Sequence, residues 1–179
     1  MFNKLFGRNR EDDAVHDLYV SLVTQARSEV FFREMGVPDS LDGRFDLLTL
    51  HMFLILRRLK TEHERTAGFS QKLFDLMFRD MDLSLREAGV GDVGVGKRVK
   101  AMVQGFYGRI SAYEEALGSS HEDLFLALQR NLYGTVEVNQ ECLDRMCGYI
   151  KHQQAALAAT DVSEILSGKA GFQGMPDLQ

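Results

Sequence analysis

Apolar residues recur at intervals of three and four along most of the chain, the spacing of helices with one buried face. The stretch Arg44–Lys60 is more apolar than such a helix requires. Its clearly polar interior residues are only Asp46, Thr49, His51, Arg57 and Arg58. The unbroken apolar part is shorter than the roughly 18 residues that cross a bilayer. We therefore expect this helix to be enclosed by the rest of the chain, or to keep an apolar face for a partner.

Five further segments show the same period and are expected to be helices. The strongest helix breaker is absent between Pro38 and Pro176, the two prolines of the chain. A short segment, Asp161–Leu166, has room for another turn or two. We therefore predict an all-α fold, a single compact bundle of about six to seven helices. The five segments are Asp12–Arg27, Phe69–Ala88, Val93–Leu117, Ser120–Gly134 and Val138–Ala158.

Several residues are expected to fix the helix ends and contacts. Asp42 is expected to cap the central helix. Ser119 or Ser120, with an acidic residue three positions later (Glu122 or Asp123), has the spacing of a capping box. Glycine costs stability inside a helix. We therefore expect Gly105 and Gly108, which lie in the segment Val93–Leu117, to let another helix approach closely.

The predicted organisation is one helical domain over residues 11–167, with a flexible basic and apolar segment at residues 1–10 and a disordered Gly-rich tail at residues 168–179. The first segment is too weakly apolar for a signal peptide. Its three apolar residues and its basic residues have the character of an anionic membrane contact, and a frayed terminus is the simpler interpretation. The expected location is the cytoplasm. A more specific alternative is peripheral contact with the inner face of the cytoplasmic membrane.

Charge and cysteine content narrow the function. A net charge of −5 argues against general nucleic-acid binding, which depends on clustered Lys and Arg. The two cysteines, Cys142 and Cys147, are too few for a disulfide framework, and their spacing places them on different faces of a helix. We expect both to be structural.

Candidate catalytic motifs are incomplete. Gly91 to Lys97 has the spacing of a phosphate-binding loop, but Arg98 stands where that loop needs a hydroxyl, and a helix rather than a strand precedes it. Asp92 is expected to cap the following helix instead. The five histidines form no metal-binding pair. His51 is expected to be a hydrogen-bonded core residue. We predict that the protein is not an enzyme and holds no cofactor or metal.

The segment from Val93 to Tyr113 carries four basic residues and no acidic one. The preceding helix carries four acidic residues, so the two helices have the charges to pair with each other. The alternative is a basic face that attracts an acidic or membrane-adjacent partner. The four basic residues are Lys97, Arg98, Lys100 and Arg109.

A series of short segments, in order along residues 15–157, resembles the ubiquinol–cytochrome c chaperone family. We expect a bacterial member of this family, because the first residues do not resemble a transit peptide. The segments are Leu18-Tyr19 through Gln25-Ala26-Arg27, Gly36-Val37-Pro38-Asp39, Asp42-Gly43-Arg44-Phe45-Asp46, Leu50-His51 through Arg57-Arg58, Phe74-Asp75 with Met81-Asp82, Gly89-Val90-Gly91-Asp92 with Gly96-Lys97, and Phe106-Tyr107-Gly108-Arg109.

The resemblance implies a non-enzymatic assembly chaperone for cytochrome b of ubiquinol–cytochrome c reductase (complex III), one that holds an apolar client near the membrane. A second assembly factor is a further candidate partner. Two alternatives remain: a helical-bundle enzyme acting on a quinone or isoprenoid-like substrate, hinted at by Asp80-Met81-Asp82, and a structural homo-oligomer. The candidate client-binding residues are Arg44, Asp46, His51, Arg57, Arg58, Met77, Met81, Lys97, Arg98, Lys100, Phe106, Tyr107 and Arg109.

Overall fold

The computed structural model describes residues 10–174, and within that range every regular element is a helix. The helices are α1 (Arg10–Ala26), α2 (Glu29–Arg33), α3 (Leu41–Lys60), α4 (His63–Glu87), α5 (Asp92–Leu117), α6 (His121–Asn131), α7 (Gln140–Ala159) and α8 (Val162–Leu166). Six of them are longer than ten residues, while α2 and α8 have five residues each. The prediction of an all-α bundle is confirmed.

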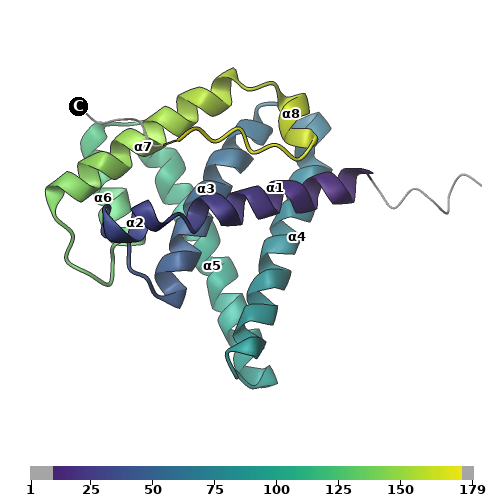
Figure 1. Cartoon of the computed structure of the whole chain (residues 1–179), viewed down its shortest axis with the longest axis horizontal. Coiled ribbons are helices and arrows are strands. Elements are labelled where there is room, and N and C mark those ends of the chain that lie inside the picture. Colours follow the sequence, from purple (N-terminus) through teal and green to yellow (C-terminus); the bar gives the residue numbers. More distant parts are fainter. Residues whose placement is uncertain (1–9, 175–179) are drawn as a thin grey trace, which may run out of the picture.

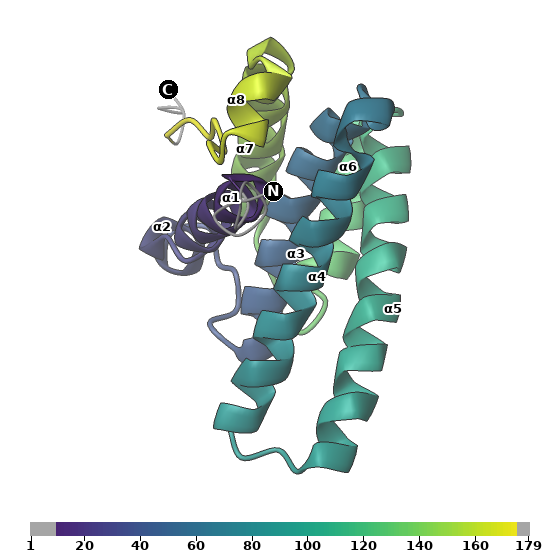
Figure 2. The ribbon, with the colours of Figure 1, turned by 90° about the vertical axis from the view of Figure 1, so that its right-hand side faces the viewer.

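The helices form two groups around α3 (Figures 1 and 2). α1, α2, α7 and α8 lie on one side of α3, and α4 and α5 lie on the other. α4 and α5 run antiparallel, and their joined ends extend beyond the rest of the molecule. We call these joined ends, residues 82–99, the arm.

The apolar excess of α3 is covered by the chain itself. Twelve of its 20 residues are buried, including Leu47, Leu50 and Met52. α3 packs against α1, α4, α5 and α7. A helix enclosed on several sides needs apolar residues around most of its circumference. The choice between an enclosed helix and a partner-binding helix is therefore resolved in favour of enclosure over most of α3.

The helix ends differ from the sequence predictions in detail. α3 is capped by Ser40 rather than Asp42, since the extended backbone of Ser40 lets its Oγ accept a hydrogen bond from the Gly43 amide at 3.1 Å. Asp92 caps nothing; Gly91 occupies the N-cap of α5, and Asp92 pairs with Arg86. The capping box at α6 is confirmed and is formed by Ser120 with Asp123.

α4 begins at His63, six residues before Phe69, where the apolar stripe predicted the start of this helix. Its first turns carry polar side chains that face solvent, which removes the apolar signal without breaking the helix. Thr66 is the exception, because it is buried and its hydroxyl donates to the Leu59 carbonyl at 2.7 Å.

Gly105 and Gly108 do not admit a neighbouring helix, contrary to the prediction. A Cβ atom at Gly108 would meet nothing within 4 Å, and one at Gly105 would meet only the Arg109 side chain. The close approach occurs at Gly43, where a Cβ atom would lie 2.1 Å from the Pro38 carbonyl oxygen. Here glycine lets the chain turn sharply into α3.

Residues 168–173, which we call the strap, follow α8 and lie against α1 and α7 (Figure 1). Ala170 is buried, and the buried Gln153 side chain bonds both the amide and the carbonyl of Gln173, at 2.9 and 2.8 Å. The packed part of the chain thus extends past the expected boundary at residue 167, because the buried amide of Gln153 needs these partners. Residues 1–9, for which a flexible basic segment was predicted, lie outside the described residues, as do residues 175–179.

Candidate functional site

A cleft of about 760 Å³ lies between the second half of α3, the first half of α4 and the second half of α5. Its volume falls within the roughly 300–1,000 Å³ typical of ligand pockets. The large apolar side chains that line it are Phe53, Leu56, Phe74, Phe106, Tyr107 and Ile110. It lies where α3 ceases to be fully enclosed, since Leu56 and Arg57 are only half-buried.

The cleft wall is largely aromatic. Phe74 is the central ring, with ring centroids 5.4 Å from Phe106 and 5.6 Å from Tyr107. Behind it, Phe78 contacts Phe74 at 4.7 Å and Phe106 at 5.6 Å. Edge-to-face and tilted ring pairs of this kind favour a fixed arrangement of side chains. Tyr107 is 59% exposed, so an apolar ring is available to a partner at the lip of the cleft.

Polar residues form the rim. Arg57 Nε lies 3.1 Å from Glu114 Oε2 across the cleft between α3 and α5. The rim also includes four exposed residues, which are Lys60, His63, Gln71 and Glu115. An apolar wall with a polar rim is the arrangement of grooves that receive an apolar helix.

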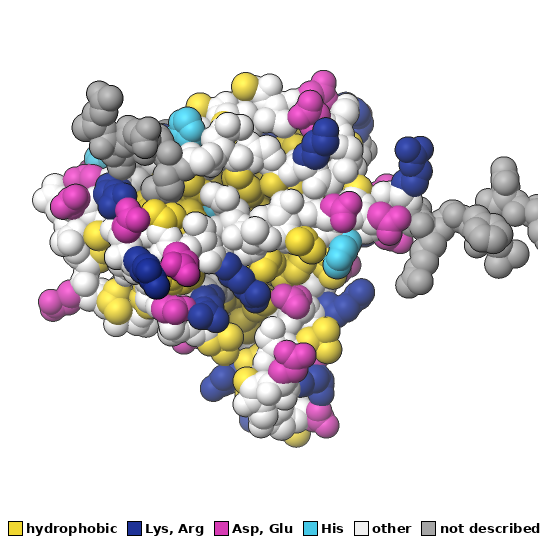
Figure 3. Space-filling model, viewed as in Figure 1, with side chains coloured by type: hydrophobic (Ala, Val, Ile, Leu, Met, Phe, Trp, Pro, Cys, Tyr) yellow, Lys and Arg dark blue, Asp and Glu magenta, His cyan; other side chains and the backbone are white. Residues whose placement is uncertain are grey.

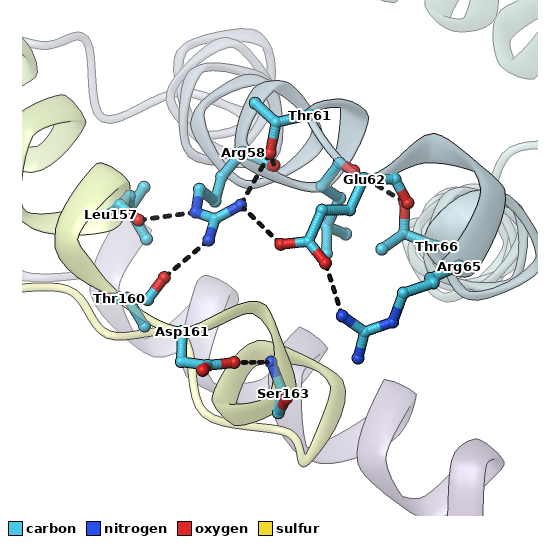
Figure 4. A network of polar contacts seen from close by, with 10 residues as sticks. Arg58, Thr61, Glu62, Arg65, Thr66, Leu157, Thr160, Asp161 and Ser163 are labelled. Atoms are coloured by element: carbon cyan, nitrogen blue, oxygen red, sulfur yellow. Dashed lines mark hydrogen bonds and ion pairs between the residues drawn. The ribbon is translucent and has the colours of Figure 1, made fainter.

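The predicted basic residues divide into two groups. Arg44 pairs with Asp39 at 2.7 Å, and Arg57 pairs with Glu114. Arg58 donates to the carbonyl oxygens of Leu157 and Thr160 at the end of α7, at 2.9 and 2.8 Å (Figure 4). Arg57 and Arg58 thus join helices that are distant in the sequence, whereas the Arg44–Asp39 pair is an exposed contact between residues five apart.

Three basic residues near the start of α5 have no such role. Lys97, Arg98 and Lys100 are exposed and form no ion pair within the described part of the chain. The expected pairing between α4 and α5 does not reach them, because α4 acids have other partners: Asp82 binds Arg86, and Asp80 accepts a hydrogen bond from Tyr19 at 2.8 Å.

The fourth basic residue of α5, Arg109, is paired internally. Its Nη2 lies 2.7 Å from Asp46 Oδ1 on α3, and both side chains are mostly buried. Burial raises the pKa of Asp46 to about 6, although the Arg109 charge acts in the opposite direction. This pair joins α3 to α5 below the cleft and does not line it.

His51 lies in the core, as predicted. Its Nδ1 is 2.8 Å from the Leu47 carbonyl oxygen, which can only accept, so Nδ1 donates and Nε2 accepts from the Tyr149 hydroxyl at 2.8 Å. Gln25 donates to the same hydroxyl at 2.9 Å. Burial lowers the pKa of His51 to about 4, so the ring is neutral at neutral pH.

The structure thus brings only three of the predicted residues to the cleft: Arg57, Phe106 and Tyr107. Met77 and Met81 are buried in the core, where α4 packs against the neighbouring helices. Sequence reasoning missed the four remaining apolar residues of the cleft wall. The available signal was the extra width of the stripes on α3 and α4, which does not tell which apolar residues stay uncovered. The missed residues are Phe53, Leu56, Phe74 and Ile110.

Residues 10–174 form neither a metal-binding cluster nor a phosphate-binding loop. No group of three or more His, Cys, Asp or Glu side chains in that range could hold a metal ion. Gly94 and Gly96 lie inside the first turns of α5, so all of this segment after the N-cap Gly91 is helix rather than a phosphate-binding loop. Cys142 and Cys147 are free thiols. In the same range, no helix is long and apolar enough to cross a membrane.

The face that carries α1, α7 and the strap offers no comparable site (Figure 3). Charged side chains of both signs are interspersed across it. The cavity beside the strap has a volume of about 440 Å³, and a second cavity near Ser40 has a volume of about 370 Å³. Neither has an aromatic wall like that of the cleft. The cleft is therefore the best-formed candidate site in the described residues.

Comparisons with known proteins identify the family of the chain. The family described as Ubiquinol-cytochrome C chaperone matches residues 33–172. Ubiquinol-cytochrome-c reductase complex assembly factor 1 of Xenopus laevis is 25% identical over 154 residues, which cover 83% of this chain and 74% of that protein. The Mus musculus protein of the same name is 26% identical over 154 residues. That match covers 83% of this chain but only 50% of the mouse protein, so the chain spans about half of that relative's length.

A solved structure extends the likeness to the fold. The crystal structure of the Cbp3 homolog from Brucella abortus is 32% identical and superposes with a TM-score of 0.84. The match covers 95% of this chain and 94% of that one. The helical arrangement described above is therefore shared over nearly its whole length.

Proposed function

The chain belongs to the ubiquinol-cytochrome C chaperone family, and from this premise we propose that it is a non-enzymatic assembly chaperone that holds an apolar segment of cytochrome b in the cleft between α3, α4 and α5. The observation that carries the proposal is the uncovered aromatic wall of the cleft. Large apolar surfaces are normally buried, and an exposed one with a polar rim marks a binding site.

The form of the cleft supports a helical client. It is bounded by three helices and is open along its rim, so a client helix would lie in it with its apolar face toward Phe74 and Ile110. Membrane-protein segments that have not yet inserted carry such apolar faces. Holding one in the cleft would keep it from aggregating until it assembles.

The test replaces Tyr107 and Ile110 by Asp in cells from which the gene has been deleted. We expect the double variant to lose at least about tenfold in capture of newly made cytochrome b, because a charge in an apolar site costs several kcal/mol. The measurement is co-purification of cytochrome b with the variant, together with complex III accumulation.

The matched control places Asp at Val20 and Val136, which are 48% and 42% exposed and lie outside the cleft. Thermal melting checks that both double variants fold. Equal capture of cytochrome b by the two would overturn the proposal, and normal cytochrome b in the deletion strain would overturn the chaperone role itself. Sedimentation of the wild-type protein tests whether a second copy fills the cleft.

A further inference from the structure

One face of α5 runs without interruption from the cleft to the arm. Val93, Lys100, Tyr107 and Glu114 follow each other at seven-residue intervals. Seven residues turn the helix to within about 20° of two full turns, so successive members of this series lie on nearly the same side of the helix, with a drift of about 60° over the whole series. Tyr107 and Glu114 line the cleft, while Val93, 76% exposed, lies on the arm.

Two free positive charges lie on this face. Lys97 and Lys100 are three residues apart and therefore neighbours on the helix surface. Both are exposed and have no ion-pair partner among the described residues, in a chain whose net charge is −5. At 1.5 Å per residue, Lys100 lies roughly 10 Å and Lys97 roughly 15 Å from Tyr107 along the helix axis.

Neighbouring acidic residues do not neutralise these lysines. On α4, the carboxylate of Asp75 accepts a hydrogen bond from Gln71 at 2.8 Å, and Asp82 is held by Arg86. At the other end of the cleft, Glu115 is exposed on the rim, while the Glu114 carboxylate is paired with Arg57. The unpaired positive charge on this helix therefore lies toward the arm, and its acidic side chains lie at the far end of the cleft.

We infer that the cleft and the pair Lys97 and Lys100 form one interaction surface, which selects an apolar helical segment with acidic residues roughly 10–15 Å beyond its apolar stretch. This inference rests on the proposed function of the cleft. It also gives the client segment an orientation in the cleft. The acidic end of the segment lies toward the arm, and its other end lies at Glu114 and Glu115.

A protein helix fits this surface better than an anionic membrane does. The lysines occupy a narrow strip on one helix, and a helix laid along α5 contacts that strip alone. A flat anionic surface resting on the arm would also meet the exposed carboxylate of Glu87, whereas the charge of Asp92 is already balanced by Arg86. The Glu87 carboxylate would repel the surface and weaken the attraction of the lysines.

The test measures binding of labelled synthetic peptides to the purified protein by fluorescence anisotropy. The peptides share one apolar leucine- and alanine-rich helix and end in glutamates, glutamines or lysines. We expect the glutamate peptide to bind about three- to tenfold more tightly than the glutamine peptide, as two exposed ion pairs would give. Added salt should reduce this preference because it screens exposed charges.

The variant Lys97→Gln/Lys100→Gln should bind the glutamate and glutamine peptides equally. The matched control, Arg27→Gln/Lys169→Gln, removes two exposed charges outside the cleft and should keep the preference. If wild type binds both peptides equally, the inference fails while the proposed function stands. If no peptide binds, both fail. If the lysine pair matters only for binding to vesicles containing anionic lipid, the surface is a lipid contact and the inference is overturned.

Discussion

α3 and α5 are both long, largely apolar helices, yet the chain covers them very differently. Twelve of 20 residues of α3 are buried, against four of 26 in α5. Several apolar residues of α5, among them Val103 and Ile110, are only half-buried. The comparison separates two uses of apolar sequence: α3 supplies the core that holds the helices together, and α5 supplies a surface that is left open beside it.

The test of this difference with the largest expected effect truncates one apolar residue on each helix. Leu50→Ala on α3 should destabilise the protein by about 2–5 kcal/mol, because it leaves a cavity in a fully buried site. Ile110→Ala on α5 should cost less than about 1.5 kcal/mol, since its side chain already borders the open cleft. Urea unfolding measures both. Equal losses would mean that α5 is a core helix and that the cleft has no free wall.

A second test uses two titrating residues of α3. The raised pKa of Asp46, about 6, means that the folded protein binds more protons than the unfolded chain between about pH 4 and 6, so this residue's contribution to stability falls as pH rises through that window. The lowered pKa of His51, about 4, has the opposite effect: stability rises with pH from about 4 to 6.5. In the wild type the two contributions largely cancel.

Single substitutions should reveal each slope. In Asp46→Asn the free energy of unfolding should rise by about 1–3 kcal/mol between pH 4 and 6.5, and in His51→Gln it should fall over a similar range. Urea unfolding across this pH range measures the slopes, and the difference between each variant and the wild type isolates one residue. Parallel curves for all three proteins would show that neither residue is enclosed as described.

The smallest expected change in stability comes from replacing one glycine on each helix by alanine. Gly108→Ala on α5 should stabilise the protein by about 0.5–1 kcal/mol, because a Cβ atom there meets nothing within 4 Å and alanine favours helix. Gly43→Ala on α3 should destabilise it, because the added atom would overlap the Pro38 carbonyl. Thermal melting distinguishes the signs. A loss of stability in Gly108→Ala would indicate that this face of α5 is already covered in solution.

The helices themselves were predictable because their apolar periods and breaks are local properties of the sequence. The role of His51 was also predictable, since a lone histidine within an apolar run usually finds hydrogen-bond partners in the core. The sequence did not predict which residues of the apolar stripes are covered by other helices. Leu56 and Leu59 look equivalent in the sequence, yet one lines the cleft and the other is fully buried. That difference depends on which helices pack nearby, which no local pattern encodes.

The same limit applies to the charged residues. Arg58 and Lys97 both read as surface cations, but Arg58 reaches carbonyl groups about a hundred residues away in the chain, and Lys97 reaches none of the described residues. Only the tertiary arrangement shows that Arg44, Arg57, Arg58 and Arg109 are engaged within the protein. The free charges on α5 therefore became a candidate recognition element only after these pairings were known.

The position of His51 has a practical consequence for spectroscopy. Its ring contacts Phe31 of α2, Tyr149 of α7 and Phe172 of the strap, and through Tyr149 it is linked to Gln25 of α1. Because the ring stays neutral near pH 7, its NMR resonances should not titrate there and should respond instead to movement of any of these neighbours. His51 is thus a built-in reporter of the core: a constant signal on peptide binding indicates a rigid α3, and a shifted signal indicates that occupancy of the cleft is transmitted to the strap.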